Sequence, residues 1–126
     1  MAHYTGIDMI EISRIRRAIA RWGEPFLNKV YTRAEIERYR DKPSSLAARF
    51  ACKEAVMKLL GTGRRGMGWR EIETLNHASG KPLIRLYGRA QDKANELGLQ
   101  EITVSLSHSK TYAIASVIGV TEKERD

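Results

Sequence analysis

The sequence contains a single cysteine, Cys52, so no disulfide can form within the chain. Its spacing from Ala48, Ala55 and Leu59 places the thiol on the apolar side of a predicted helix, and we expect it to pack in the core and not to act as a nucleophile. The chain lacks the run of about 20 apolar residues that a membrane-spanning helix needs. Residues 1–5 show neither the basic nor the apolar segment of a secretory signal. These absences predict a protein of the reducing cytoplasm without a membrane role.

Aromatic residues are also scarce, with two Phe, two Trp and five Tyr in the whole chain. They do not alternate with basic residues as in the stacking surfaces of nucleic-acid-binding proteins. Neither zinc-ligand spacing nor a recognised nucleic-acid motif occurs. Acidic residues are fewer than basic ones, 15 against 22, which gives a net charge of +7. This charge favours anionic substrates or acidic protein partners, and we expect no nucleic acid among them.

The chain length predicts one domain that spans residues 1–126. With 126 residues, of which 42% are hydrophobic and 29% charged, the composition is that of a soluble globular protein. This length is enough to bury one core and too short for two independent cores. No second catalytic domain is therefore expected.

Glu54 and Lys58 stand four residues apart on a predicted helix, a spacing at which two side chains share a face. Ala47 and Ala51 fall beside them, so the pair is predicted to stand on a strip of small side chains with room for a metal and a phosphate. An ordinary surface ion pair, worth a few tenths of a kcal/mol, is the alternative.

Residues 4–12 are predicted to form a strand, in which period two places Asp8 on one face with Ile10 and Ile12 and places Glu11 on the other. A carboxylate among inward-facing apolar residues needs a partner or a cation to offset its burial. Asp8 is therefore a candidate cation ligand. The alternative is an aspartate at the strand end that caps the next helix.

The next helix is predicted to begin with Ser13 as its N-cap. Arg14, Arg17 and Arg21 recur at i, i+3 and i+7 and project along one ridge of this helix. A solvated face is the default interpretation, and docking of an acidic partner is the alternative. The apolar side is formed by residues three and four apart: Ile12, Ile15, Ala18, Ile19 and Trp22.

Further elements follow from capping and turn signals. A capping box at Thr32 to Glu35 starts a helix that runs to about Arg40. Residues 41–45 break it, and the helix that carries Glu54 then ends at Gly61. The glycine-rich segment 61–68 can bring backbone amides and the guanidinium groups of Arg64 and Arg65 close to phosphates, or it is a flexible connector.

The second half of the chain is predicted to contain two hairpins and a helix. The predicted strands are 71–75 with 82–87 and 102–107 with 112–117, and the predicted helix is 89–97. His108 falls where the third of these strands gives way to a turn. It can bind an anion there, although a lone turn histidine is more often incidental.

Three segments, in order along the chain, carry a resemblance. They are Gly6-Ile7-Asp8 followed by Arg14-Ile15; Arg49-Phe50-Ala51-Cys52-Lys53-Glu54-Ala55 with Lys58 and Gly61-Thr62-Gly63; and Ser105-Leu106-Ser107-His108-Ser109. Together with Gly80-Lys81-Pro82, they resemble the bacterial holo-acyl-carrier-protein synthases, which are the short 4'-phosphopantetheinyl transferases.

The resemblance implies transfer of 4'-phosphopantetheine from coenzyme A to a serine of an apo acyl carrier protein, with release of adenosine 3',5'-bisphosphate. It implies that Asp8 and Glu54 bind Mg²⁺ and that Lys58 is a third catalytic group. The residues that it implies for coenzyme A binding are Arg49, Lys58, Gly61, Gly63, Pro82, His108 and Ser109. It also implies that the acidic carrier protein binds to Arg14, and we place Arg17 and Arg21 on the same ridge.

The resemblance further implies an α+β fold, with a small antiparallel sheet packed on a long helix, and a homotrimer whose sites lie at subunit boundaries. Two departures from the family pattern are visible, at Ser109 and in the variable loop that carries Arg64 and Arg65, and one position differs from the larger relatives. Ile10 stands where larger relatives carry a further acidic ligand, so water is expected in that position. Ser109 replaces a common threonine and keeps the hydroxyl. Phosphate binding by Arg64 and Arg65 is a hypothesis without family support.

Two other functions are compatible with the residues alone. The Asp8 and Glu54 pair suits a different Mg²⁺-dependent phosphoryl or nucleotidyl transferase, for which ATP turnover without coenzyme A would be expected. A basic binding module without enzymatic activity would leave Glu54 and Lys58 as a surface pair. That module predicts no loss of function from Glu54→Ala.

Overall fold

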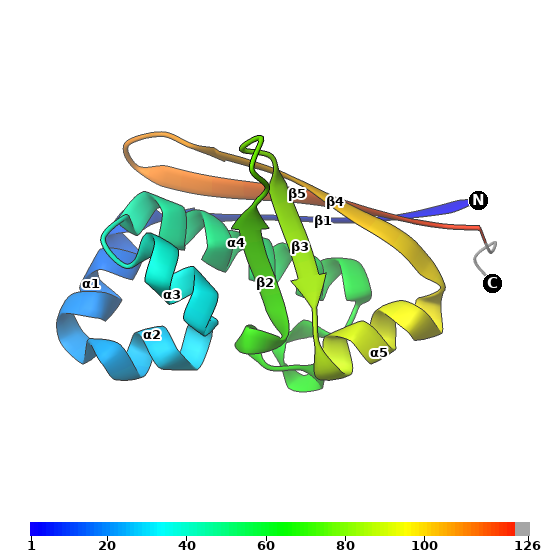
Figure 1. Cartoon of the computed structure of the whole chain (residues 1–126), viewed down its shortest axis with the longest axis horizontal. Helices are drawn as coiled ribbons and strands as arrows, with labels where there is room; N and C mark the ends of the chain where they lie inside the picture. The colour runs from blue at the N-terminus through cyan, green and yellow to red at the C-terminus, as the bar shows by residue number, and fades with distance from the viewer. Residues whose placement is uncertain (123–126) are drawn as a thin grey trace.

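A long helix lies along a three-stranded antiparallel sheet in the computed structural model, which describes residues 1–122 except for the side chains of Arg64 and Arg65 (Figure 1). The predicted α+β class and the small antiparallel sheet on a long helix are confirmed. The elements in chain order are β1 (Ala2–Glu11), α1 (Ile12–Trp22), α2 (Glu24–Val30), α3 (Arg33–Tyr39), α4 (Pro43–Leu60), η1 (Gly63–Gly66), η2 (Trp69–Glu71), β2 (Ile72–Asn76), β3 (Pro82–Leu86), α5 (Gly88–Leu97), β4 (Leu99–His108) and β5 (Tyr112–Thr121).

The three-stranded sheet has the order β1-β5-β4, so the chain's first strand and its penultimate strand form the two edges. The register places Asp8 opposite Ala115, which in turn stands opposite Leu106. Side chains of these three residues share the face that packs on α4, because cross-strand partners point to the same side of a sheet. Gly6 lies on this face too, where any Cβ would clash with the carbonyl of Ala55. The edge strand β1 therefore lies directly against α4.

The strip of small residues on α4 is filled by the protein itself, which corrects one prediction. Ala47 and Ala51 are completely buried, and α4 packs along β1 and β5. The helix is buried on most of its circumference because the sheet, α3 and the β2–β3 hairpin surround it. No room for a ligand remains on the strip itself.

The start of α1 also differs from the prediction. The helix begins at Ile12, its N-cap position is Glu11, and no side chain caps it. The backbone N–H of Ile12 donates instead to the carbonyl of Thr111 at 2.8 Å. This tertiary contact satisfies the first backbone N–H of the helix, which has no acceptor within the helix. Ser13 lies inside the first turn, where its Oγ accepts a hydrogen bond from Arg17 at 3.5 Å.

Two features of the helical region were not expected from the sequence. Trp22, predicted on the buried side of α1, is 57% exposed and lies 5.1 Å from the guanidinium of Arg21. The short helix α2 was missed altogether. Its signals are Gly23, which has a φ of 58°, followed by Pro25 in the first turn, a position that proline favours.

The remaining predicted elements are confirmed with small shifts in their ends. The capping box of α3 has both of its hydrogen bonds. Gly61 ends α4 in the left-handed conformation, and Gly98 does the same for α5. The pairs β2–β3 and β4–β5 are both antiparallel, and β4 ends at His108, one residue beyond the predicted end of that strand.

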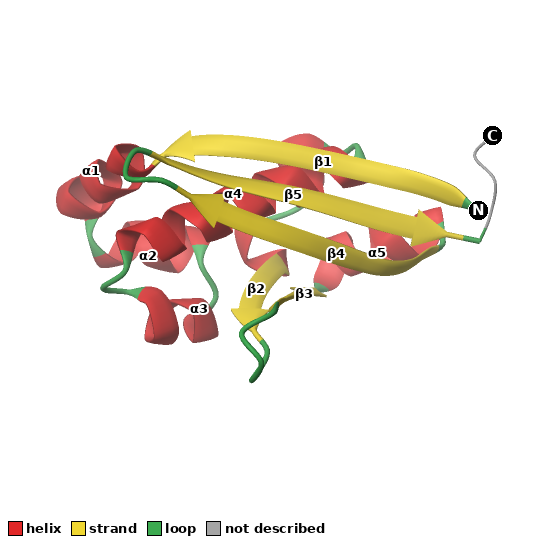
Figure 2. Cartoon of the chain, turned by 90° about the horizontal axis from the view of Figure 1, so that it is seen from above, coloured by secondary structure: helices red, strands yellow, loops and turns green. Residues whose placement is uncertain are grey.

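The second face of the three-stranded sheet is open. Figure 2 shows β1, β5 and β4 side by side with the helices behind them, and three large apolar side chains of this face, Ile7, Met9 and Ile118, are between 45% and 58% exposed. No helix formed by residues 1–122 is long and apolar enough to cross a membrane.

Candidate active site

Asp8 and Lys58 meet at the edge of the sheet formed by β1. The ammonium of Lys58 donates to Asp8 Oδ1 at 2.9 Å and to the carbonyl of Ile7 at 3.0 Å. The Lys58 side chain is 56% exposed and that of Asp8 20%. Because such a pair gains little from its own attraction, both groups can exchange partners when an anion or a cation arrives.

Glu54 lies one helical turn before Lys58 on α4 and is half-buried. The carboxylates of Asp8 and Glu54 fit the oxygen ligands that Mg²⁺ takes from proteins, which are usually one or two carboxylates completed by water and substrate phosphates. Among the described residues, no three acidic, His or Cys side chains gather to hold a metal alone. Ile10 is buried beside Asp8 on β1 and supplies no oxygen.

Arg49 is almost fully buried and binds the hairpin from α4. Its Nε donates to the carbonyl of Thr74 at 3.2 Å, and one terminal nitrogen donates to Asn76 Oδ1 at 3.0 Å. The other donates to the carbonyl of Ser45 at 3.4 Å, and the guanidinium stacks 3.8 Å from the Tyr39 ring centroid. These acceptors are uncharged oxygens, so they do not neutralise the positive charge of Arg49.

A cavity of about 340 Å³ adjoins Arg49 at the edge of the sheet formed by β4. It is lined by Arg49, Asn76, Pro82 and His108, together with the last residues of β4. Three residues predicted to bind coenzyme A, namely Arg49, Pro82 and His108, thus meet around one cavity. Asn76 was missed by sequence reasoning, since nothing local distinguishes an asparagine at a strand end from a turn residue.

Ser109 serves the turn that follows β4. Its Oγ accepts the backbone N–H of Thr111 at 3.2 Å and that of Tyr112 at 3.1 Å. The ring nitrogen Nδ1 of His108 lies 3.3 Å from the carbonyl oxygen of Ser109. The hydroxyl of Ser109 therefore shapes the turn that holds His108.

Gly61 and Gly63 end α4 and start the following loop. Both have positive φ, 75° and 59° respectively, which favours glycine. Residues 63–66 form the short helix η1. The side chains of Arg64 and Arg65 lie outside the described part of the structure, so their predicted phosphate contact stays a hypothesis.

The predicted site residues fall into two groups on opposite sides of α4. Asp8 and Lys58 stand at the β1 edge of the sheet, whereas the cavity around Arg49 and His108 stands at the β4 edge, with β5 between them. Arg49 and Lys58 are nine residues apart, which corresponds to about 13 Å along a helix. One chain therefore presents two halves of the predicted site and does not join them.

The arginine ridge of α1 borders a second cavity of about 440 Å³. Arg14, Arg17 and Arg21 are exposed at its rim, as their spacing predicted. Its other lining residues are all apolar: Ile10, Ile15, Ala18, Trp22, Phe26 and Phe50. A basic rim around an apolar floor suits an acidic protein helix better than a small anion.

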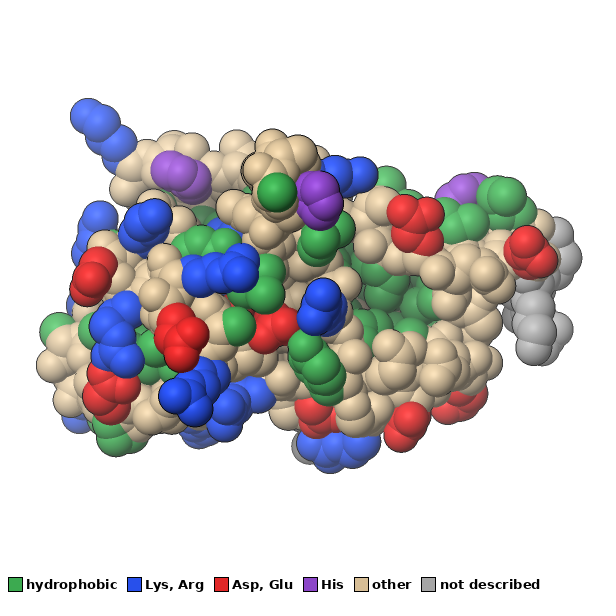
Figure 3. All heavy atoms as spheres, in the orientation of Figure 1, with side chains coloured by type: hydrophobic (Ala, Val, Ile, Leu, Met, Phe, Trp, Pro, Cys, Tyr) green, Lys and Arg blue, Asp and Glu red, His purple; other side chains and the backbone are tan. Residues whose placement is uncertain are grey.

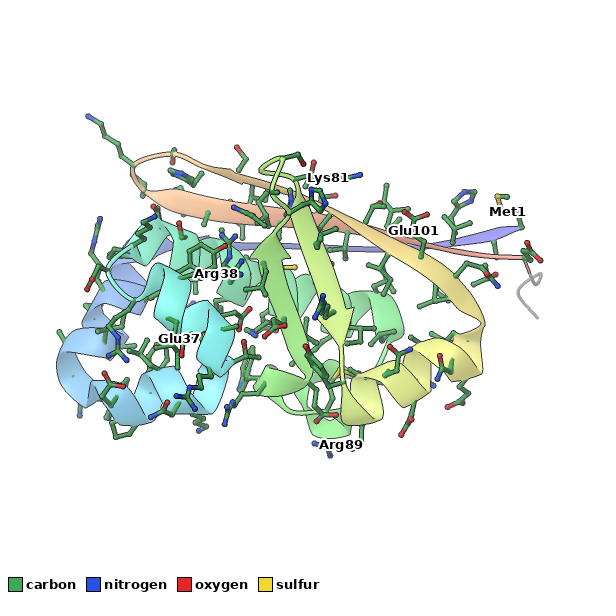
Figure 4. The ribbon with its side chains drawn as sticks, viewed as in Figure 1. Met1, Glu37, Arg38, Lys81, Arg89 and Glu101 are labelled. Atoms are coloured by element: carbon green, nitrogen blue, oxygen red, sulfur yellow. The ribbon has the colours of Figure 1, made fainter. Side chains whose placement is uncertain are left out.

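A larger cavity, of about 520 Å³, lies between β3, α5 and β4, where Figure 3 shows a hollow with hydrophobic side chains at its floor. Lys81, which directly precedes β3, and Glu101, which belongs to β4, line it and are labelled in Figure 4. It shares Pro82 and Val104 with the cavity around Arg49. Of the predicted site residues, its lining includes Pro82 alone within the described chain.

Cys52 has the packing role that its spacing predicted. Its side chain is completely buried, and its Sγ accepts the hydroxyl of Thr74 at 3.2 Å. Burial raises the pKa of the thiol to about 11. Because the thiolate is the reactive form, such a group is a poor nucleophile near neutral pH.

The chain is similar to known proteins in sequence and in structure. The family model of the 4'-phosphopantetheinyl transferase superfamily matches residues 4–117. A holo-[acyl-carrier-protein] synthase of Herpetosiphon aurantiacus is 54% identical over 123 residues, which cover 92% of this chain and 97% of the relative. The crystal structure of the Helicobacter pylori holo-[acyl-carrier-protein] synthase in complex with coenzyme A superimposes with a TM-score of 0.83 at 32% identity, over 92% of this chain and 99% of that one.

Proposed function

The chain belongs to the holo-[acyl-carrier-protein] synthases of the 4'-phosphopantetheinyl transferase superfamily, and we propose how its residues carry the reaction. The enzyme transfers phosphopantetheine from coenzyme A to an apo acyl carrier protein. We propose that the reaction depends on Mg²⁺ and releases adenosine 3',5'-bisphosphate. The observation that supports this best is the partly exposed Asp8 and Lys58 pair one turn from Glu54.

Asp8 and Glu54 would hold the Mg²⁺ ion, since Glu54 lies one helical turn before Lys58, which contacts Asp8. The ion would supply positive charge to the pyrophosphate oxygens. Lys58 would exchange its bond to Asp8 for a bond to a phosphate oxygen and so stabilise the charge that develops during the displacement. The nucleophilic serine belongs to the carrier protein, so this chain needs no nucleophile of its own.

The cavity around Arg49 would bind the adenosine bisphosphate part of coenzyme A. Arg49 keeps an uncompensated charge against its uncharged partners, and His108 and Pro82 line the same cavity. Guanidinium and imidazole groups suit a phosphate, and proline offers an apolar surface to a base. Gly61, Gly63 and Ser109 would complete the site through the backbone and the turn that they shape.

A complete site would need two copies of the chain, because its halves lie on opposite edges of the sheet. We propose a homotrimer in which the β1 edge of one copy faces the β4 edge of the next. The open sheet face with Ile7, Met9 and Ile118 supports an assembly, since such apolar side chains are usually covered in oligomers.

Mixed oligomers test this arrangement. Neither Asp8→Asn nor Arg49→Ala should be active alone, but co-expression of the two variants should restore about one quarter of the sites if each site takes one half from each neighbour and assembly is random. Absence of any restored activity in verified mixed trimers would contradict shared sites. Sedimentation of the wild type as an active monomer would contradict the trimer.

The basic ridge of α1 with its apolar groove would bind the acidic carrier protein. Arg14, Arg17 and Arg21 supply the charge, and Phe26 and Phe50 supply the floor. We further propose that residues 1–126 form one domain, that the enzyme acts in the cytoplasm, and that its product serves fatty acid biosynthesis.

Intact mass spectrometry of an apo acyl carrier protein tests the reaction. Incubation with the enzyme, coenzyme A and Mg²⁺ should add one phosphopantetheine group to the carrier. The modification should disappear with EDTA and with Asp8→Asn or Glu54→Gln. Glu37→Gln is the matched control, because Glu37 is an exposed helical carboxylate that pairs with Arg33 on the surface of α3. An unmodified carrier with the wild-type enzyme would refute the proposal.

A further inference from the structure

Lys53 precedes Glu54 in the sequence, yet its side chain is completely buried. Its ammonium donates to Glu35 Oε1 at 2.8 Å, to the carbonyl of Trp69 at 3.1 Å and to the carbonyl of Ile72. All three N–H bonds of the ammonium therefore have partners. Burial lowers the pKa of Lys53, and the charge of Glu35 opposes this shift.

Glu35 uses both carboxylate oxygens in the same cluster. Oε1 also accepts the backbone N–H of Thr32 at 2.9 Å, and Oε2 accepts the backbone N–H of Thr74 at 2.9 Å. The buried pair of Glu35 and Lys53 thus joins the start of α3 and the middle of α4 to the strand β2.

Side chains occupy the edge of β2 that faces away from β3. The carbonyl of Ile72 is bound by Lys53, the N–H of Thr74 by Glu35 and the carbonyl of Thr74 by Arg49. These groups alternate along one edge of the strand, as they would when facing another strand. One carboxylate from α3 and two cations from α4 therefore bind the edge of β2 in place of a neighbouring strand.

The bonds from Lys53, Glu35 and Arg49 to β2 set the position of the cavity proposed to bind coenzyme A. Asn76 ends β2, accepts from Arg49 at 3.0 Å and stands opposite Pro82 in the hairpin. Asn76, Pro82 and Arg49 all line the cavity. A shift of β2 along α4 would therefore move two of the lining residues relative to the third.

We propose that Lys53 and Glu35 are positioning residues for coenzyme A, which fix the β2–β3 hairpin in the register that aligns Asn76 and Pro82 with Arg49. This role rests on the proposed function of the Arg49 cavity. An apolar pair of similar size often matches the stability of a buried ion pair. It lacks directional bonds, however, and cannot select one register of the strand.

The double variant Glu35→Met with Lys53→Met tests this role, because it removes both charges and keeps the core filled. We expect the KM for coenzyme A to rise by about tenfold and kcat to stay within about threefold, since Asp8 and Lys58 are untouched. The dissociation constant of coenzyme A measured by calorimetry should rise in parallel. Amide hydrogen exchange of Thr74 should become faster, because its acceptor is Glu35.

Leu27→Ala is the control for a loss of stability alone, since Leu27 is a buried residue of α2 outside the cluster. It should lower the melting temperature and leave the KM for coenzyme A within about twofold. A folded double variant with the wild-type KM and dissociation constant would overturn the proposal. If the double variant does not fold, Glu35→Gln decides by the same criteria. Failure of the proposed role of the Arg49 cavity would appear separately, as an Arg49→Ala enzyme that keeps the wild-type dissociation constant for coenzyme A.

Discussion

Lys53 and Lys58 stand five residues apart on α4, and each contacts one carboxylate, but the two ion pairs lie in opposite environments. Lys53 is completely buried with Glu35, whereas the side chain of Lys58 is 56% exposed beside Asp8. Lys53 donates to two backbone carbonyls in addition to its carboxylate. Lys58 donates to one.

The difference shows how solvent decides the role of a charge. A buried ammonium loses its hydration and needs a fixed set of partners, so it stabilises one arrangement of the chain. A partly exposed ammonium is still hydrated and binds its partner weakly, so a phosphate can replace that partner. On one helix, Lys53 is thus suited to stabilise the fold, and Lys58 is suited to bind a phosphate.

The largest expected effect is on stability. Lys53→Met should lower the free energy of unfolding by about 3–5 kcal/mol, because it leaves Glu35 buried without its cation. Lys58→Met should change it by at most about 1 kcal/mol, since the lost pair is partly exposed. Urea unfolding of both variants measures the difference. Equal losses in the two variants would remove the distinction between the pairs.

The second effect is on catalysis and should have the reverse order. Lys58→Met should lower kcat by about 10²-fold, because it removes a positive charge from the reacting phosphate. Its melting temperature should stay near that of the wild type. Intact-mass kinetics at saturating coenzyme A and carrier protein provide the measurement, and Lys93→Met, at a half-buried lysine of α5 that pairs with Glu96, is the control. A Lys58→Met enzyme with wild-type kcat would contradict a catalytic role of Lys58.

A smaller effect is expected at the exposed arginines of α1. Arg14→Glu with Arg17→Glu should raise the KM for the carrier protein by about tenfold at low salt, because two attractive charges become repulsive. The effect should shrink as salt increases. Arg33→Glu with Arg38→Glu, on α3, is a control of equal charge change. If both pairs raise the KM equally, net charge and not the ridge of α1 directs docking.

The smallest effect concerns Glu71, whose carboxylate is neither as buried as that of Glu35 nor as available as that of Asp8. Burial alone would raise the pKa of Glu71, but hydrogen bonds from the backbone of Gly68 and from Arg89 and Ala90 outweigh it and lower the pKa. Its contribution to stability is therefore present above the unfolded-state pKa of about 4.3 and is lost as the pH falls through the lower folded-state value.

Melting curves of the wild type and Glu71→Gln between pH 7 and pH 3 measure this contribution. The wild type should melt at a higher temperature than Glu71→Gln at pH 7, and this difference in melting temperature should become smaller as the pH falls. Glu96 is an exposed carboxylate at the end of α5, the helix that Glu71 contacts. The difference in melting temperature between the wild type and Glu96→Gln should change less with pH. A difference in melting temperature that grows toward pH 3 would contradict a lowered pKa of Glu71.

Local signals in the sequence predicted most of the elements that carry the site. Thr32 and Glu35 mark the start of α3, Gly61 marks the end of α4, and alternation marks the strands, because each signal acts within a few residues. One wrong prediction was Ser13 as a cap: the helix already begins at Ile12, whose N–H binds the carbonyl of Thr111, a group far along the chain. The motif residues predicted for the site stay predictions, although the structure brings Asp8 to Lys58 and gathers Arg49, Pro82 and His108.

By itself the sequence determined the class of fold, the family and the residue types available for the chemistry, since these depend on periodicity, capping and ordered motifs. Only the tertiary structure decided which charges are buried. Lys53 and Glu54 are neighbours in the chain, but one helical step of 100° turns the first toward Glu35 and the core and leaves the second half-buried. Hydropathy does not distinguish two lysines on one helix, because their solvation is set by strands and loops that pack against it from distant parts of the sequence.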